Sequence, residues 1–184
     1  MNNVILVPGF NGVSIIFEWF KNELSQKGYN VTILETPLRD AITWRGYEEA
    51  FGKIKDLLPG SIVIAHSIGC AMTVKYFAAN NIQVKAFISL AGFPRAFETP
   101  NRPDLDKGVL ETTFDASTGA HFAELVENRF SIYSDNDHIV PRELLEEFPM
   151  MIRSQAIEIP NVGHMGSKSG LTEFPVVTDI IENL

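Results

Sequence analysis

The sequence predicts a three-layer α/β fold in which a mostly parallel, six-stranded sheet is covered by helices on both faces. Two observations favour this fold. Short apolar runs alternate along the 184-residue chain with longer segments whose apolar residues recur at helical spacing, an order typical of parallel sheets with helical crossovers. The apolar runs are also continuous rather than alternating, as burial on both faces of a sheet requires. The length suits a single domain over residues 1–184.

Six segments are predicted to be strands because each is a short, apolar, mostly β-branched run that ends at a turn signal. The first, "NVILV", is broken by Pro8 and Gly9, and the third, "SIVIA", stops just before a short serine-containing turn. The predicted strands are residues 3–7, 30–34, 61–65, 84–91, 129–134 and 155–160.

The segments between these strands carry apolar residues three or four positions apart, which predicts helices with one face on a core. Gly28 suits the C-cap of the first helix, and Pro141 suits the first turn of the helix over "RELLEEF". The segment from 93 to 115 contains three prolines and breaks the pattern, so we interpret it as a long functional or mobile loop. The predicted helices are residues 15–28, 47–58, 68–80, 117–128, 142–148 and 175–184.

Composition narrows the possible partners and the compartment. The formal net charge is −8, which disfavours binding to nucleic acid or to an anionic membrane surface. Cys70 is the only cysteine, so no internal disulfide forms and nothing requires an oxidising compartment. The first residues lack a signal-peptide pattern and no apolar run is long enough for a transmembrane helix. We therefore expect a cytoplasmic protein, and the oligomeric state is not indicated.

Ser67 lies where the third predicted strand turns into a helix. Ligands of open α/β sheets bind beyond the carboxyl ends of the strands, so Ser67 is expected at the functional edge. The small residues Ala65 and Gly69 lie two positions before and after it, the pattern of a nucleophile elbow with Ala in place of the first Gly. An ordinary serine in a tight turn is the alternative. A phosphate-binding turn is disfavoured because the glycine-rich and lysine-containing phosphate motifs are missing.

A serine nucleophile needs a base, and the sequence has four histidines. His164 is favoured because it follows the last predicted strand in the turn-rich "PNVGHMGSKSG", at the same sheet edge as Ser67. His66 lies inside the elbow and is expected to be structural and to point away from the face of Ser67. His121 falls in a helical pattern, and His138 is a potential neighbour of the site.

The base in turn needs an orienting acid, and "SIYSDNDHIVP" supplies two candidates after the fifth strand. Asp137 is favoured, with Asp135 as an alternative that more often stabilises a turn. The "DND" triplet lacks the spacing of a calcium loop, so no metal is expected. The resulting order Ser67, Asp137, His164 places each residue after a different predicted strand and predicts a nucleophile, an acid and a base.

The segments "AHSIG", "SDNDHIVP" and "GHM" resemble the nucleophile, acid and histidine segments of the α/β-hydrolase family. In finer detail the chain is similar to the small serine hydrolases related to retinoblastoma-binding protein nine. The resemblance covers essentially the whole chain and implies the strand order 2-1-3-4-5-6 without a large cap domain. It also implies that "VPGFNG" supplies one oxyanion-hole amide, from Phe10 or, if the loop is shifted, Asn11. The amide of Ile68 would be the second.

The expected activity is cleavage of a small ester through a Ser67 acyl-enzyme, without a metal or organic cofactor. Asn11, Phe93 and Phe97 are candidates for contacting the acyl substrate. An amidase, an aminopeptidase-like hydrolase or a thioesterase would use the same three residues. A hydrolase-like scaffold that binds a protein partner and a flavodoxin-like nucleotide-binding domain are the alternatives from other classes.

Overall fold

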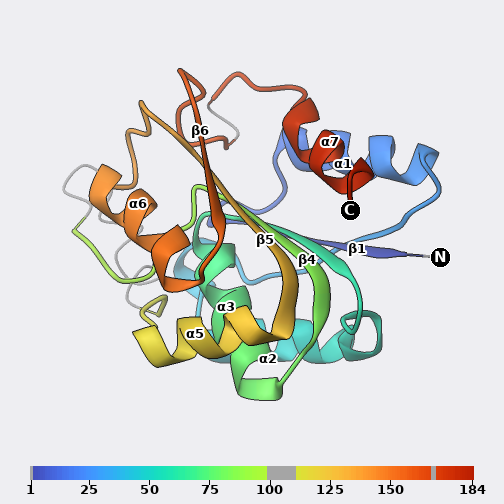
Figure 1. Ribbon diagram of the computed structural model, residues 1–184, viewed down its shortest axis with the longest axis horizontal. Coiled ribbons are helices and arrows are strands. Elements are labelled where there is room, and N and C mark those ends of the chain that lie inside the picture. Colours follow the sequence, from blue (N-terminus) through green and yellow to red (C-terminus); the bar gives the residue numbers. More distant parts are fainter. Residues whose placement is uncertain (1, 99–110, 167–168) are drawn as a thin grey trace.

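A six-stranded parallel sheet runs through the centre of the computed structural model, which describes residues 2–98, 111–166 and 169–184 (Figure 1). Its strand order, β2-β1-β3-β4-β5-β6, confirms the expected topology, and every neighbouring pair is parallel. The strands are β1 (Asn3–Val7), β2 (Asn30–Ile33), β3 (Ile62–His66), β4 (Val84–Leu90), β5 (Val126–Ser134) and β6 (Gln155–Ile159).

Helices cover both faces of this sheet, as predicted. In Figure 1, α1 and α7 lie on one side of the sheet, whereas α2, α3 and α5 lie on the other. The helices are α1 (Ile15–Gln26), α2 (Trp44–Lys53), α3 (Ile68–Asn80), α5 (Ala116–Leu125), α6 (Arg142–Met151) and α7 (Pro175–Glu182), with short 3-10 turns at Arg39–Ala41 and Lys55–Leu57. No helix in the described part of the chain is long and apolar enough to cross a membrane.

The core is thickest around β3 and α3. All five residues of β3 are buried, and α3 is buried on nearly every side because it lies between the sheet and the helices α2 and α5. This packing holds the β3–α3 junction, where Ser67 lies, on a rigid support. Most of the predicted loop 93–115 falls outside the described residues.

Two predicted helix ends are wrong by several residues. The helix expected over 117–128 ends at Leu125, and β5 begins at Val126 instead of residue 129. The reason is tertiary: Val126 pairs with Val84 and Asn128 with Ala86, so these residues extend the ladder with β4. The second shift, at the end of α2, is larger. The helix expected over 47–58 ends at Lys53 and continues only as a 3-10 turn.

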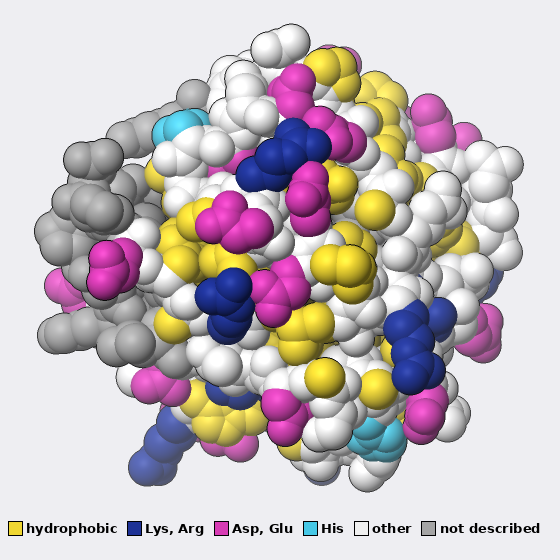
Figure 2. Space-filling view, turned by 60° about the vertical axis from the view of Figure 1, so that its left-hand side comes forward, with side chains coloured by type: hydrophobic (Ala, Val, Ile, Leu, Met, Phe, Trp, Pro, Cys, Tyr) yellow, Lys and Arg dark blue, Asp and Glu magenta, His cyan; other side chains and the backbone are white. Residues whose placement is uncertain are grey.

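The surface shown in Figure 2 mixes both charge signs. Lys and Arg side chains lie apart from one another on this face and have Asp or Glu beside them, with apolar side chains between. Such pairing is also present in the contacts of Arg142, which lies 2.8 Å from Glu146 and 2.9 Å from Glu158. The described side chains on this face therefore form no continuous basic patch.

A close contact between α5 and α6 depends on a glycine. A Cβ added at Gly119 would lie 2.6 Å from the carbonyl oxygen of Met151, whereas a Cβ added at Gly52 in α2 would meet nothing within 4 Å. Backbone atoms cannot move aside as a flexible side chain can, so the two helical glycines differ sharply in their tolerance of a methyl group.

We predict that Gly119→Ala lowers the free energy of unfolding by about 1–3 kcal/mol, because overpacking forces α5 and α6 apart. The matched control, Gly52→Ala, is expected to raise it by about 0.5–1 kcal/mol through better helix propensity. Urea unfolding curves of the two variants measure both changes. Equal midpoints for the two variants would contradict this account of the α5–α6 contact.

Candidate active site

The three residues singled out by the sequence lie at the carboxyl ends of β3, β5 and β6. Ser67 occupies the N-cap position of α3, Asp137 lies in the loop after β5, and His164 lies in the loop after β6. Because these strands are parallel and belong to one sheet, the three loops emerge at the same edge. The structure therefore places all three side chains where ligands of such sheets bind.

The three side chains form a continuous chain of hydrogen bonds. Ser67 Oγ lies 3.0 Å from His164 Nε2, and His164 Nδ1 lies 2.7 Å from Asp137 Oδ2. A carboxylate can only accept, so Nδ1 of His164 carries the hydrogen and Nε2 is left to accept from the serine hydroxyl. The imidazole is thus held in the orientation in which it can remove the proton of Ser67.

Asp137 is the better placed of the two candidate acids. Its side chain is 1% exposed, and its Oδ1 accepts hydrogen bonds from the amides of Ile139 and Val140 at 2.8 Å and 3.1 Å. Burial alone would raise the pKa of this carboxyl, but its hydrogen bond and charge interaction with His164, together with the two amides, keep its pKa below 3.8. Asp137 is therefore ionised beside His164.

Asp135 makes a different contact. Its side chain is exposed, and its Oδ1 accepts from the amide of Asn161 at 2.8 Å. This carboxylate therefore holds the start of the loop that carries His164 without touching the imidazole in the described contacts. Its position agrees with the turn-stabilising alternative considered for Asp135.

The backbone at Ser67 is strained. Its φ of 55° and ψ of −125° lie outside the regions that ordinary residues prefer. Two glycines make room for this sharp turn. A Cβ at Gly69 would lie 2.7 Å from the carbonyl oxygen of Pro8, and one at Gly9 would lie 3.2 Å from Cβ of Ser67. Any side chain at position 69 would therefore push the elbow away from the loop that follows β1.

That loop contains Phe10 and Asn11, the alternatives expected for the first oxyanion donor. It turns tightly, with the Gly12 amide donating to the Gly9 carbonyl at 3.0 Å, while Phe10 is buried and Asn11 is exposed. Ile68 is the first residue of α3. Among the described residues, no turn, loop or cap hydrogen bond uses the amide of Phe10 or Ile68 as donor. The roles of these two amides, and of Asn11, stay predictions.

Phe93 and Phe97 pack against each other after β4. Their ring centres are 5.1 Å apart in an edge-to-face arrangement. Phe93 is 2% exposed and belongs to the core, and Phe97 is partly buried against it. Their expected contact with substrate stays a prediction.

His66 is the site neighbour that the sequence reasoning placed incorrectly. It is buried, but it does not point away from the site. Its Nε2 lies 2.8 Å from the carbonyl oxygen of His164, and the two rings are 4.9 Å apart. A carbonyl can only accept, so Nε2 of His66 is protonated. Burial, together with the adjacent His164, lowers the pKa of His66 to about 3. His66 is therefore a neutral donor that supports the backbone of His164.

The remaining histidines lie outside the hydrogen-bonded chain. His121 Nε2 contacts Asn81 Oδ1 at 2.9 Å and is partly exposed, in agreement with the expected surface or core placement. His138 is exposed beside the loop of His164, and a Cβ at Gly163 would lie 3.8 Å from its Nδ1. No group of three or more His, Cys, Asp or Glu side chains in the described ranges could hold a metal ion.

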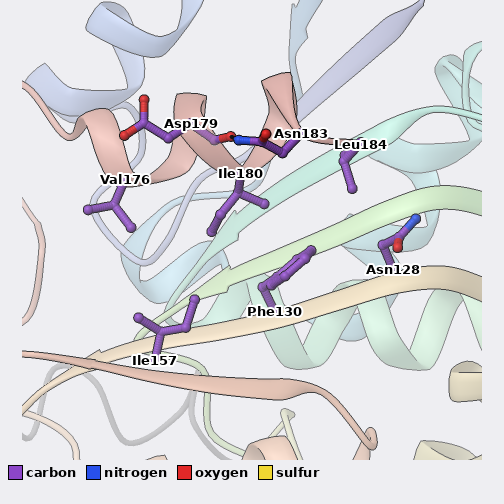
Figure 3. A pocket seen from close by; sticks show the side chains of 8 residues that line it. All are labelled: Asn128, Phe130, Ile157, Val176, Asp179, Ile180, Asn183 and Leu184. Carbon is purple, nitrogen blue, oxygen red and sulfur yellow. Dashed lines mark hydrogen bonds between the residues drawn. The ribbon is translucent and has the colours of Figure 1, made fainter.

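A separate groove of about 390 Å³ lies between α7 and the strands β5 and β6. In Figure 3, Phe130 and Ile157 project from the sheet, and Val176 and Ile180 project from α7 toward them. None of Ser67, Asp137 and His164 contributes to its lining, which consists of Asn128, Phe130, Ile157, Val176, Asp179, Ile180, Asn183 and Leu184.

Comparisons with known proteins identify the family of the chain and its fold. A family model described as serine hydrolase matches residues 4–183. The solved structure of the ydeN gene product from B. subtilis superposes with a TM-score of 0.82 at 22% identity, covering 100% of this chain and 98% of that one. A carboxylesterase structure from the thaumarchaeon Nitrososphaera gargenis superposes with a TM-score of 0.75 at 14% identity, covering 99% of this chain and 89% of that one.

A predicted CIB-like hydrolase from Thermoplasma acidophilum superposes with a TM-score of 0.68 at 17% identity, covering 100% of this chain and 87% of that one. No curated protein matches the chain. At these identities the solved structures establish the shared α/β-hydrolase fold.

The neutral His66 predicts a specific pH dependence of stability. In the unfolded chain His66 takes up a proton below its ordinary pKa of 6.5, whereas in the folded protein it does so only near pH 3. The unfolded state therefore binds more protons between these values, and the free energy of unfolding falls as the pH is lowered through this window.

We predict that His66→Gln, which keeps an N–H donor but cannot titrate, reduces this loss of stability on acidification. One proton corresponds to a slope of at most about 1.4 kcal/mol per pH unit. Urea unfolding of wild type and variant between pH 7 and pH 4 measures the difference. The same pH dependence in both proteins would show that His66 is not the responsible group.

Proposed function

The chain belongs to the serine hydrolase family and is a hydrolase, and we propose that it cleaves small carboxylic esters through an acyl-enzyme formed on Ser67. The observation that carries this proposal is the hydrogen-bonded sequence from Ser67 through His164 to Asp137. A nucleophile, a base and an orienting acid in this arrangement perform acyl transfer on several unrelated folds.

In the proposed reaction, Ser67 Oγ attacks the carbonyl carbon of the ester while its proton passes to Nε2 of His164. The tetrahedral intermediate then expels the alcohol, which takes that proton from His164, and the acyl group remains on Ser67. Water attacks the acyl-enzyme with His164 again accepting a proton. The acid product leaves, and Ser67 is restored with its hydroxyl proton.

Asp137 has a supporting part in this proposal. Its ionised carboxylate keeps the hydrogen of His164 on Nδ1 and stabilises the imidazolium formed in each step. The neutral state of His66, whose pKa is near 3, helps because no second positive charge opposes the one that develops on His164.

The negative oxygen of the tetrahedral intermediate is proposed to be held by the amides of Phe10 and Ile68. The support is their position: Phe10 lies in the loop after β1, Ile68 begins α3, and β1 and β3 are paired neighbours. The helix N-terminus at Ile68 adds a favourable dipole. Loss of one such donor typically lowers kcat by about 10²–10³-fold.

An ester is the preferred substrate class because an alcohol departs more readily than an amine with the same machinery. The fold shared with the carboxylesterase from Nitrososphaera gargenis supports this choice. The proposed compartment is the cytoplasm, because the lone cysteine, Cys70, is buried and needs no oxidising surroundings.

We predict that wild type hydrolyses p-nitrophenyl esters of short acyl chains and is labelled by a fluorophosphonate probe. Ser67→Ala is expected to fold normally, to lose labelling, and to lower kcat by about 10⁴-fold or more. Thermal unfolding serves as the control for folding. Undiminished labelling of Ser67→Ala would remove Ser67 from the mechanism, and an unlabelled, inactive wild type would favour the scaffold alternative.

We predict that Asp137→Asn lowers kcat by about 10⁴-fold, because an amide can no longer hold the imidazole tautomer. Asp135→Asn is the matched control two residues away. It keeps an oxygen that can accept from the amide of Asn161, so kcat is expected to fall by less than about tenfold. Steady-state kinetics on one ester compares the two variants. Equal effects would refute the assignment of the acid.

A further inference from the structure

The segment that carries Asp137 holds residues 161–164 of the loop that carries His164. Each residue of 134–137 accepts a hydrogen bond from one residue of 161–164, so that four consecutive side chains meet four consecutive residues. The contacts are Ser134 Oγ with the Val162 amide at 3.1 Å, Asp135 Oδ1 with the Asn161 amide at 2.8 Å, Asn136 Oδ1 with the Gly163 amide at 2.8 Å, and Asp137 Oδ2 with His164 Nδ1 at 2.7 Å. We call residues 134–137 the acid-loop clamp.

The held loop needs such support because its own backbone is irregular. Asn161, Gly163 and Met165 all have left-handed φ values, of 58°, 57° and 52°. A segment in which every second residue has a left-handed φ can form neither a strand nor a helix. The amides of residues 161–163 find their acceptors outside the loop, in side chains of residues 134–136. The strands β5 and β6 are paired up to Ser134 and Ile159, which brings the clamp alongside the loop.

Within the clamp, Asn136 has the central position. Its Oδ1 accepts from the Gly163 amide and from the Ser134 hydroxyl, each at 2.8 Å. Gly163 directly precedes His164, and Asn136 directly precedes Asp137. The Oδ1 atom of Asn136 thus links the residue before the acid with the residue before the base. The side chain of Asn136 is also exposed, so its replacement leaves the core intact.

We propose that Asn136 is a positioning residue, which sets the distance between His164 and Ser67 by holding the Gly163 amide. This proposal rests on the proposed function, since it assigns Asn136 a part in the same reaction. The far side of His164 is held separately, because its carbonyl accepts from His66 Nε2 at 2.8 Å. Loss of the Asn136 contact is therefore expected to loosen the imidazole without releasing the loop.

The expected consequence is a loss of kcat with little change in KM. Proton transfer depends steeply on the 3.0 Å contact between Ser67 Oγ and His164 Nε2, and a displacement of about 1 Å can cost about 10²-fold in rate. Within the described part of the chain, Asn136 makes its hydrogen bonds with Ser134 and Gly163 and not with Ser67, Phe10 or Ile68, so binding of the ester before reaction is not expected to change.

Three variants test this proposal. Asn136→Ala removes the acceptor oxygen, whereas Asn136→Asp keeps an acceptor oxygen on a side chain of the same size. His138→Ala alters an exposed side chain two residues away in the same loop. We expect Asn136→Ala to lower kcat for p-nitrophenyl acetate by about 10- to 100-fold with KM changed less than about twofold. Asn136→Asp is expected to recover most of kcat, and His138→Ala to match wild type.

Amide hydrogen exchange at Gly163 gives a readout that does not depend on activity. Protection of this amide is expected to fall in Asn136→Ala and to persist in Asn136→Asp and His138→Ala. Wild-type kcat in Asn136→Ala, or equal losses in Asn136→Ala and Asn136→Asp, would overturn the proposal. An inactive wild type with the expected exchange pattern would refute the proposed esterase activity, and with it the catalytic role of Asn136. Unchanged Gly163 protection in Asn136→Ala would overturn the clamp itself.

Discussion

The sharp turn from β3 into α3 is the constraint on which the rest of the site depends. Ser67 alone separates the last residue of β3 from the first residue of α3, and its unusual backbone conformation costs about 1–3 kcal/mol. The surrounding core holds it there. The Ser67 amide donates to the carbonyl of Leu90 at 2.8 Å, and the adjoining strand and helix are almost wholly buried. The turn presents the hydroxyl at the carboxyl end of β3, where α3 begins.

The charges around this hydroxyl are arranged so that one imidazole can become positive. Asp137 is kept ionised by the amides of Ile139 and Val140 and by His164. His66, whose ring centre is 4.9 Å from that of His164, is kept neutral by burial. The two neighbouring histidines, His164 and His66, therefore differ in function because their surroundings differ. One accepts from a hydroxyl, and the other donates to a backbone carbonyl.

The parallel sheet explains how two chains of low sequence identity share this fold. The chain shares 22% identity with the ydeN gene product from B. subtilis yet superposes over 100% of its length. A parallel sheet tolerates many different apolar residues in its strands, since their packing needs volume and pattern more than identity. Positions where backbones meet closely are more demanding, such as Gly69 at the start of α3, whose added Cβ would lie 2.7 Å from the carbonyl oxygen of Pro8.

The sequence by itself determined the strand–helix alternation, the elbow at Ser67 and the order of serine, acid and histidine. These features are local patterns, and the parallel sheet then places the ends of its strands together whatever their sequence separation. The end of α5 at Leu125 could not be read in this way, because the pairing of Val126 with Val84 decides it.

Only the tertiary structure placed Asp137 rather than Asp135 against His164, turned His66 toward His164, and matched the residues of the acid-loop clamp with those of the next loop. The physical reason is that each of these contacts joins segments 26 to 98 positions apart. Their geometry depends on loop backbone angles, such as those at Asn161 and Gly163, which local residue preferences do not specify.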